Sequence, residues 1–431
     1  MTLHSNLLRL KQSKLAKDSS WMFVGQGTSY LLQAMYFVAL ARLLGATEYG
    51  LYVGVFSIVS ILSQYGALGS GTVFMRYVGR DKTRFDVYWG NILITTLLSG
   101  TLLVILSELL ARRFISPMST SLLTMAAISN CICSQLLGCI GQVFQTFERI
   151  RFAAGLTLLS NLLRFIAAIV LLFTIHTATA LQWTAAALLV SVVAVSVGIV
   201  AVAVSVGQPT IAPRLFIQHI GEGFEYSLAS STASVYNDID KAILTHQGMN
   251  AVNGVYSMAY RVVDMATMPV LSMRDAVFPR MFREGKGCIQ GANALSGRVL
   301  ALSIAISTLV GVAILIGAPV LPVIAGPRFR ESAAILRWLC PLPMFRALHQ
   351  IAGTALTGSG LQRYRTMNQF IAAGMNLGLN LWLIPRFGWH GAASASLVTD
   401  AALGTMNWAA LSSAKRGHKH DFLGLRSSVP A

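Results

Sequence analysis

Residues 181–206 read LQWTAAALLVSVVAVSVGIVAVAVSV, a stretch that contains no Asp, Glu, Lys or Arg. A helix needs about 20 mostly apolar residues to cross the hydrocarbon core of a bilayer, and this stretch is long enough. Lipid also penalises every unpaired backbone polar group, and a helix satisfies these groups internally. The stretch therefore predicts a membrane-spanning helix.

The composition of the whole chain points the same way. Of its 431 residues, 55% are hydrophobic and 11% are charged, and the mean hydropathy is +0.63. An ordinary soluble domain has about 25% charged residues, and so few charges cannot cover a water-exposed surface. The composition excludes a soluble enzyme and predicts a multi-pass helical membrane protein.

Charged residues, glycines and prolines divide the sequence into about twelve apolar runs of spanning length. The predicted spans are 19–41, 50–74, 89–111, 118–146, 152–174, 181–206, 218–245, 252–278, 298–325, 332–357, 366–385 and 390–412. The seventh and eighth spans contain many polar residues. We therefore predict an all-α membrane protein with about 12 transmembrane helices.

The net charge of +17 comes from 33 Lys and Arg against 16 Asp and Glu. The basic residues lie in short clusters between the apolar runs and form no basic domain, which disfavours nucleic acid as a partner. With the N-terminus in the cytoplasm, about 21 Lys and Arg fall on cytoplasmic segments and about 6 on the opposite face. We therefore expect both termini to be cytoplasmic.

Two short motifs recur about 205 residues apart, which is a pattern typical of transporters built from internal repeats. Tyr49-Gly50-Leu51-Tyr52 is echoed by Asn253-Gly254-Val255-Tyr256, and Trp183 with its following alanines is echoed by Trp389 with Gly391-Ala392-Ala393. The repeats predict two six-helix lobes, 1–210 and 211–431. A pseudo-two-fold axis along the membrane normal would relate the lobes, with the binding site between them.

The seventh predicted span carries a polar stripe. Its members recur at spacings of three and four residues: Ser227, Ser230, Ser231, Ser234, Asn237, Asp238 and Lys241. Such spacing places them on one face of a helix, and we expect that face to line water. We predict that Ser230, Ser234, Asn237 and Lys241 bind substrate.

Ionisable residues at mid-span mark functional sites by default, because hydrocarbon makes a buried charge costly. Arg164, Arg261 and Arg346 lie at such depth, and we predict that they bind substrate. Asp264 is spaced to pair with Arg261, and we assign coupling to a proton or cation to Asp264, with Asp240 as second choice. The alternative for each charge is a structural ion pair or a snorkelling side chain.

Enzyme and cofactor signatures are missing from the sequence. Gly66-x2-Gly69-x-Gly71 lies in an apolar run and predicts close helix packing, not a nucleotide loop. The sequence has no Walker motif, so we do not expect ATP as the direct energy source. Cys131, Cys133 and Cys139 lie in one apolar run without His, Asp or Glu partners, which predicts packing and no metal site. We expect neither a cofactor nor a metal.

Several segments together resemble a known family. They are Lys17–Trp21, Leu40–Tyr52, Tyr236–Leu244, Val252–Arg261 and Ile384–Ala393. Their order and spacing resemble those of bacterial polysaccharide flippases, the O-antigen and exopolysaccharide transporters of the MOP exporter superfamily. The resemblance spans nearly the whole chain.

The resemblance implies two six-helix lobes around a central cavity, in a protein of the bacterial inner membrane. It implies movement of an undecaprenyl-pyrophosphate-linked saccharide from the inner to the outer leaflet, with membrane lipids, a polysaccharide polymerase and export machinery as partners. The additional C-terminal helix pair of the lipid II branch is absent from the predicted spans, which argues against lipid II as the substrate.

The predicted function is therefore a flippase that works by alternating access in lipopolysaccharide or exopolysaccharide biosynthesis. Its pyrophosphate needs cationic partners in a low-dielectric cavity, and guanidinium groups bind it in a bidentate way. One alternative is a cation-coupled multidrug exporter of the same superfamily, which would favour acidic and apolar pocket residues. A membrane glycosyltransferase or polymerase is disfavoured, since these need a large outer loop with catalytic residues.

Overall fold

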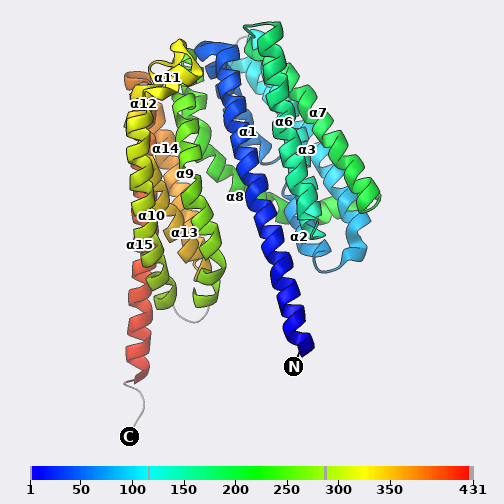
Figure 1. Ribbon diagram of the computed structural model, residues 1–431, viewed down its shortest axis with the longest axis vertical. Helices are drawn as coiled ribbons and strands as arrows, with labels where there is room; N and C mark the ends of the chain where they lie inside the picture. The colour runs from blue at the N-terminus through cyan, green and yellow to red at the C-terminus, as the bar shows by residue number, and fades with distance from the viewer. Residues whose placement is uncertain (1, 115–116, 286–288, 427–431) are drawn as a thin grey trace. The chain divides into compact units, whose positions relative to one another are not determined.

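The computed structural model describes residues 2–114, 117–285 and 289–426, and over these ranges it contains helices and turns but no strand. The prediction of an all-α fold is confirmed (Figure 1). The chain divides into two compact units, Met1–Ser234 and Val235–Ala431, and the division falls inside helix α8. The predicted lobe boundary at 210/211 precedes α8 and stays a prediction.

Three predicted spans of the first unit, 89–111, 152–174 and 181–206, each correspond to a single helix. The elements of this unit are α1 (Thr2–Ser63), α2 (Ser70–Val78), η1 (Lys82–Arg84), α3 (Phe85–Phe114), α4 (Pro117–Ala127), the π-helix η2 (Ile128–Ser134), α5 (Gln135–Thr146), α6 (Ile150–Thr174), α7 (Ala180–Ser205) and the first part of α8 (Pro213–His246). The first two predicted spans are joined in α1, which is kinked at Gly45 (φ 68°, ψ 176°). Only glycine adopts such a conformation readily.

The second predicted span, 50–74, is wrong at its end, because α1 stops at Ser63 and turns follow up to α2. The glycines of this segment allow backbones to touch. A Cβ on Gly66 would lie 2.2 Å from the Cys131 carbonyl oxygen, and one on Gly69 (φ 59°) would lie 2.5 Å from the Gly223 carbonyl oxygen. The prediction that these glycines serve close packing is confirmed.

Helix α2 is also tied to α8 by an ion pair between Arg76 Nη1 and Glu222 Oε1 at 2.6 Å. The hydrogen bond and charge of Glu222 raise the pKa of Arg76. In the following turn, the Asp81 carboxylate accepts hydrogen bonds from the Thr83 hydroxyl and backbone N–H, which lower the pKa of Asp81. These contacts fix the α2–α3 connection beside α8.

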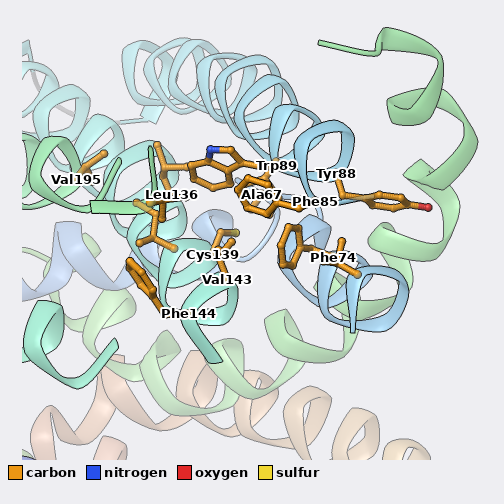
Figure 2. Close-up of a cluster of buried hydrophobic side chains, with 14 of the residues drawn as sticks. Ala67, Phe74, Phe85, Tyr88, Trp89, Leu136, Cys139, Val143, Phe144 and Val195 are labelled. Carbon is orange, nitrogen blue, oxygen red and sulfur yellow. The ribbon is translucent and has the colours of Figure 1, made fainter. Parts of the chain in front are cut away.

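The core of the first unit is apolar and aromatic (Figure 2). Trp89, 1% exposed, packs in a cluster with Phe74, Phe85 and Cys139. Cys131 and Cys133 are buried as well, so the prediction that the cysteines of this run are packing residues is confirmed. Lipid is as apolar as these side chains, so helix association here depends on close packing.

The second unit begins within α8 and continues through eight further helical elements of the described chain. They are α9 (Asn250–Gly285), α10 (Ile289–Gly317), α11 (Val320–Ala325), η3 (Pro327–Phe329), α12 (Ser332–Trp338), α13 (Leu342–Gly358), α14 (Gln362–Phe387) and α15 (Trp389–Arg426). The predicted spans 298–325 and 332–357 are each divided in two. The divisions lie at Pro319 and Pro341, because a proline cannot donate the hydrogen bond that a continuous helix requires.

Six helices in the described part of the chain are long and apolar enough to cross a membrane by themselves. They are Gly27–Ser63, Lys82–Leu109, Thr120–Thr146, Ile150–Thr174, Ala180–Ser205 and Val299–Gly317. Five of these belong to the first unit and one to the second. The protein is therefore a multi-pass membrane protein, and the helices of its second unit are markedly more polar.

Candidate functional site

Charged side chains of the second unit gather around the end of α8. Lys241 Nζ lies 3.2 Å from Asp238 Oδ1 and 3.5 Å from Asp240 Oδ1, and Lys241 and Asp240 are both buried. The hydroxyl of Tyr256 on α9 donates to the other oxygen of Asp240. A buried ammonium is thus neutralised by two carboxylates, as burial of a charge requires.

The ring of Tyr260 on α9 joins this group to a second cation. Lys241 Nζ lies 4.5 Å and Arg346 Cζ 5.1 Å from the centroid of the ring. Arg346 comes from α13, and its Nη1 is 2.7 Å from Asp264 Oδ1. We call these residues the Tyr260 cluster: Asp238, Asp240, Lys241, Tyr260, Asp264 and Arg346. Cation–π contacts of this kind contribute about 2 kcal/mol when desolvated.

The spacing of Arg261 and Asp264 on one helix pointed to a pair between them. The structure instead places Asp264 against Arg346 of another helix. Arg261 is half-buried, next to Tyr260 in the sequence, and has interactions of its own. Sequence spacing gives neighbours on one helix, whereas it gives no information on which helix lies opposite.

A second buried pair links α8, α13 and α15. Asp400, 1% exposed, accepts a hydrogen bond from the Tyr236 hydroxyl and lies 3.0 Å from His349 Nε2. Neither residue is among the site residues predicted from the sequence. The available signal for His349 was its position three residues after Arg346, since this spacing puts both side chains on one face of a helix.

The remaining predicted residues lie elsewhere or at the unit boundary. Arg164 is in the first unit on α6, half-buried beside a small pocket that Ser160 and Ser191 also line. Ser230 and Asn237 are exposed and Ser234 is half-buried. The structure therefore brings together Lys241, Asp240, Asp264 and Arg346, whereas Arg164, Ser230 and Ser234 belong to the other unit.

The polar stripe of α8 is not uniformly exposed. Ser227 and Ser231 are buried, and Ser231 Oγ lies 2.7 Å from the hydroxyl of Tyr65. One edge of the stripe thus packs against the turn that follows α1, whereas Ser230 and Asn237 are exposed. Among the residues that the structure describes, no group of three or more His, Cys, Asp or Glu side chains is placed to hold a metal ion.

The family of the chain follows from its sequence. The profile of the family described as "Polysaccharide biosynthesis protein" matches residues 15–284, which is more than half of the chain. The chain belongs to this family. An uncharacterised membrane protein of Methanocaldococcus jannaschii is 21% identical over 416 residues, which cover 89% of this chain and 81% of that protein.

Solved structures with the same fold are membrane transporters. The lipid II flippase MurJ in an inward closed conformation has a TM-score of 0.74 at 15% identity, covering 90% of this chain and 87% of that one. An inward-facing multidrug resistance MATE transporter of the MOP superfamily has a TM-score of 0.69 at 15% identity, covering 89% and 96%. A MOP superfamily transporter from Pyrococcus furiosus has a TM-score of 0.60 at 17% identity, covering 91% and 94%.

These likenesses establish the fold. The family match confirms the predicted polysaccharide family. The predicted layout of about twelve helices in two lobes fits the structures found, two of which are described as MOP superfamily transporters. The chain is thus a membrane protein of the polysaccharide biosynthesis protein family, with the same fold as these transporters. The roles of the individual site residues stay predictions.

Proposed function

We propose that the protein is a flippase for a polyprenyl-pyrophosphate-linked saccharide, which it moves from the inner to the outer leaflet of the bacterial inner membrane by alternating access. The saccharide would serve lipopolysaccharide or exopolysaccharide biosynthesis, and a polymerase and export machinery would take it up. The family of the chain and its transporter fold support this class of substrate. The Tyr260 cluster supports binding of the pyrophosphate group of this substrate.

The observation that carries the proposal is the setting of Arg346. Its side chain is 11% exposed, and its partners are the carboxylate of Asp264 and the ring of Tyr260. An unpaired guanidinium would cost at least a few kcal/mol at membrane depth, so Arg346 needs an anion at every stage of transport. A pyrophosphate can replace the carboxylate, because the guanidinium fork binds phosphate oxygens in a bidentate way.

Asp264 then acts as the exchangeable partner. Its side chain is 34% exposed, three times the exposure of Arg346, so water and ions reach it more easily. Protonation of Asp264, or its binding of a cation, would release Arg346 to the pyrophosphate. Asp240 is the second choice for this role, since it is buried against Lys241 and Tyr256. Arg261 and Arg164 supply further positive charge for the same anion.

The test is export of surface polysaccharide by cells that carry single variants. Arg346→Ala is expected to abolish export while the amount of protein in the membrane stays unchanged, and Arg346→Lys to retain part of it, since lysine keeps the charge but not the fork. Arg386→Ala is the matched control, because Arg386 is exposed on α14 and its guanidinium donates a hydrogen bond to the backbone carbonyl of Trp382 on the same helix. Normal export by an Arg164→Ala, Arg261→Ala, Arg346→Ala triple variant would refute the proposed residues.

Deletion of the gene separates this function from a multidrug exporter. We expect loss of the surface polymer with unchanged resistance to cationic dyes. Normal polymer with increased dye sensitivity would favour the exporter.

The proposed orientation has both termini in the cytoplasm. Reporter fusions at 80–86 and 280–290 should report the cytoplasm and fusions at 246–251 the periplasm. A periplasmic signal from 280–290 would overturn the orientation.

A further inference from the structure

The first unit contains a polar cavity that the proposed function has not used. Its volume is about 190 Å³, and it lies between α5, the α1–α2 turn and α8. On α5 it is lined by Gln135, Gly138, Cys139 and Gln142. These residues recur at spacings of three and four, so they form one face of the helix. Two side-chain amides, each with donors and an acceptor, therefore point from α5 to the same space.

The opposite wall is also polar and uncharged. Gln64 and Thr72 come from the α1–α2 segment, and Tyr226, Ser227 and Ser230 come from α8. Among the described residues that line this cavity there is no Asp, Glu, Lys or Arg. Hydroxyls, amides and one aromatic ring thus surround it, in contrast to the paired charges of the Tyr260 cluster.

Ser227 places in the wall of the cavity a buried hydroxyl that has no hydrogen-bond partner among the described residues. Its side chain is 2% exposed, and in the described part of the chain its Oγ has no hydrogen-bond partner. A buried hydroxyl without a partner costs about 1–3 kcal/mol. A ligand that donates or accepts hydrogen bonds in the cavity would remove this penalty.

Two glycines keep the cavity open. A Cβ on Gly71 would lie 1.8 Å from Gln142 Oε1, so Gly71 leaves room for this amide at the cavity wall. A Cβ on Gly138 would have no atom within 4 Å, so the helix face beside Gln135 is empty. The cavity is several times larger than one water needs, and smaller than the roughly 300–1,000 Å³ of sites for drug-sized molecules.

We infer that this cavity binds one uncharged sugar ring of the lipid-linked saccharide. A sugar ring carries hydroxyls around its edge, which match the amides and hydroxyls of the wall, and apolar C–H faces, which match Tyr226. A free anion would find no cation here, and an apolar drug would leave the amides unpaired. The inference rests on the proposed function and adds a subsite for the saccharide, separate from the residues proposed for the pyrophosphate.

The experiment fills the cavity with a larger side chain and measures the binding of two ligands. Gly138→Leu places a side chain in the empty space, and Gly141→Leu is the matched control, since Gly141 is on the same helix, has no atom within 4 Å of its Cβ and does not line the cavity. Native mass spectrometry of the purified protein measures binding of undecaprenyl pyrophosphate, which has no sugar. It also measures binding of the lipid-linked saccharide fraction extracted from the strain that encodes the protein.

Gly138→Leu should weaken binding of the saccharide-bearing lipid by about tenfold or more, which corresponds to the loss of one or two hydrogen bonds. It should leave the binding of undecaprenyl pyrophosphate unchanged. Gln135→Met keeps the volume of the side chain but removes the amide, and it should show the same selectivity with a smaller loss. Gly141→Leu should bind both ligands as the wild type does.

Unchanged binding of the saccharide-bearing lipid by Gly138→Leu would overturn the inference, because the cavity would then hold only water. Equal weakening of both ligands, or equal effects of Gly138→Leu and Gly141→Leu, would also overturn it. Failure of the wild type to bind either ligand would refute the proposed function itself. Arg346→Ala serves as the reference, since it should weaken both ligands.

Discussion

The interiors of the two units are built differently. In the first unit the largest fully buried side chains are Trp89, Trp183 and Tyr49. Among the residues whose burial is described, the fully buried Asp and Lys side chains, Asp240, Lys241 and Asp400, all belong to the second unit. The first unit also supplies five of the six helices that are apolar enough to span a membrane alone.

This difference indicates that the interiors of the two units serve different purposes. Packed aromatic rings and close glycine contacts are sufficient to hold helices together in lipid. Buried ion pairs are a poor way to gain stability, because hydrophobic replacements are often as stable or more so. Stability therefore explains the charges of the second unit poorly, which supports their proposed role in binding an anionic substrate and a coupling ion.

The largest effect is expected where two backbones touch in the first unit. Gly69→Val adds a side chain 2.5 Å from the Gly223 carbonyl oxygen and forces a β-branched residue to a φ of 59°. We expect folded protein to be lost from the membrane, as measured by size-exclusion profile and abundance. Gly138→Ala is the control, because a Cβ at this position has no atom within 4 Å. Wild-type abundance of Gly69→Val would show that packing in the first unit is looser than described.

A smaller loss is expected from the charges of the second unit. Lys241→Met leaves Asp240 and Asp238 without their ammonium, and breaking a buried pair costs about 3–5 kcal/mol. The melting temperature in detergent should fall markedly, and the double variant Lys241→Met, Asp240→Asn should recover part of it, since the more deeply buried carboxylate of the two then carries no charge. A double variant less stable than Lys241→Met alone would contradict this pairing.

A modest effect is expected from a conservative change in the apolar core. Ile140 is fully buried beside Trp89, and Ile140→Val removes one methylene at a cost of about 0.5–1.5 kcal/mol. Export should be unchanged, because this core serves packing alone. A loss of export at normal abundance would show that this core does more than pack the helices, and would contradict the contrast drawn between the two units.

The smallest structural effect is expected on α8. Ser230→Cys should react with a small hydrophilic thiol reagent, whereas Ser231→Cys should be protected, because Ser231 is buried beside Tyr65. Both variants should be as stable as the wild type. Equal labelling of the two would mean that the stripe lines water on both edges.

Parts of the fold could be predicted because they depend on local sequence. The charge-free run 181–206 corresponds to α7, Ala180–Ser205, and the kink at Gly45 lies in the break between the predicted spans 19–41 and 50–74. The turns between Ser63 and Ser70 were not predicted, because hydropathy does not register a break inside an apolar run. The π-helix at Ile128–Ser134 escaped prediction for the same reason.

Less of the candidate site could be predicted from the sequence. Depth in a span identified Arg346, Asp264 and Asp240 as notable, since depth can be counted along a helix. Their partners depend on which helices face one another, so the pairing of Asp264 with Arg346 and of Asp400 with His349 needed the structure. The cavity beside Gln142 was also hidden, because its residues come from three separate segments.

The most direct test of the central claim is translocation of the lipid-linked saccharide in proteoliposomes. Sodium periodate added outside oxidises sugars in the outer leaflet and does not cross the bilayer. Protein-free vesicles should therefore show oxidation of about half of the lipid, as for any symmetric bilayer. The account predicts nearly complete oxidation with the wild type under an ion gradient, and the protein-free level with Arg346→Ala. Wild-type vesicles that stay at the protein-free level would contradict it.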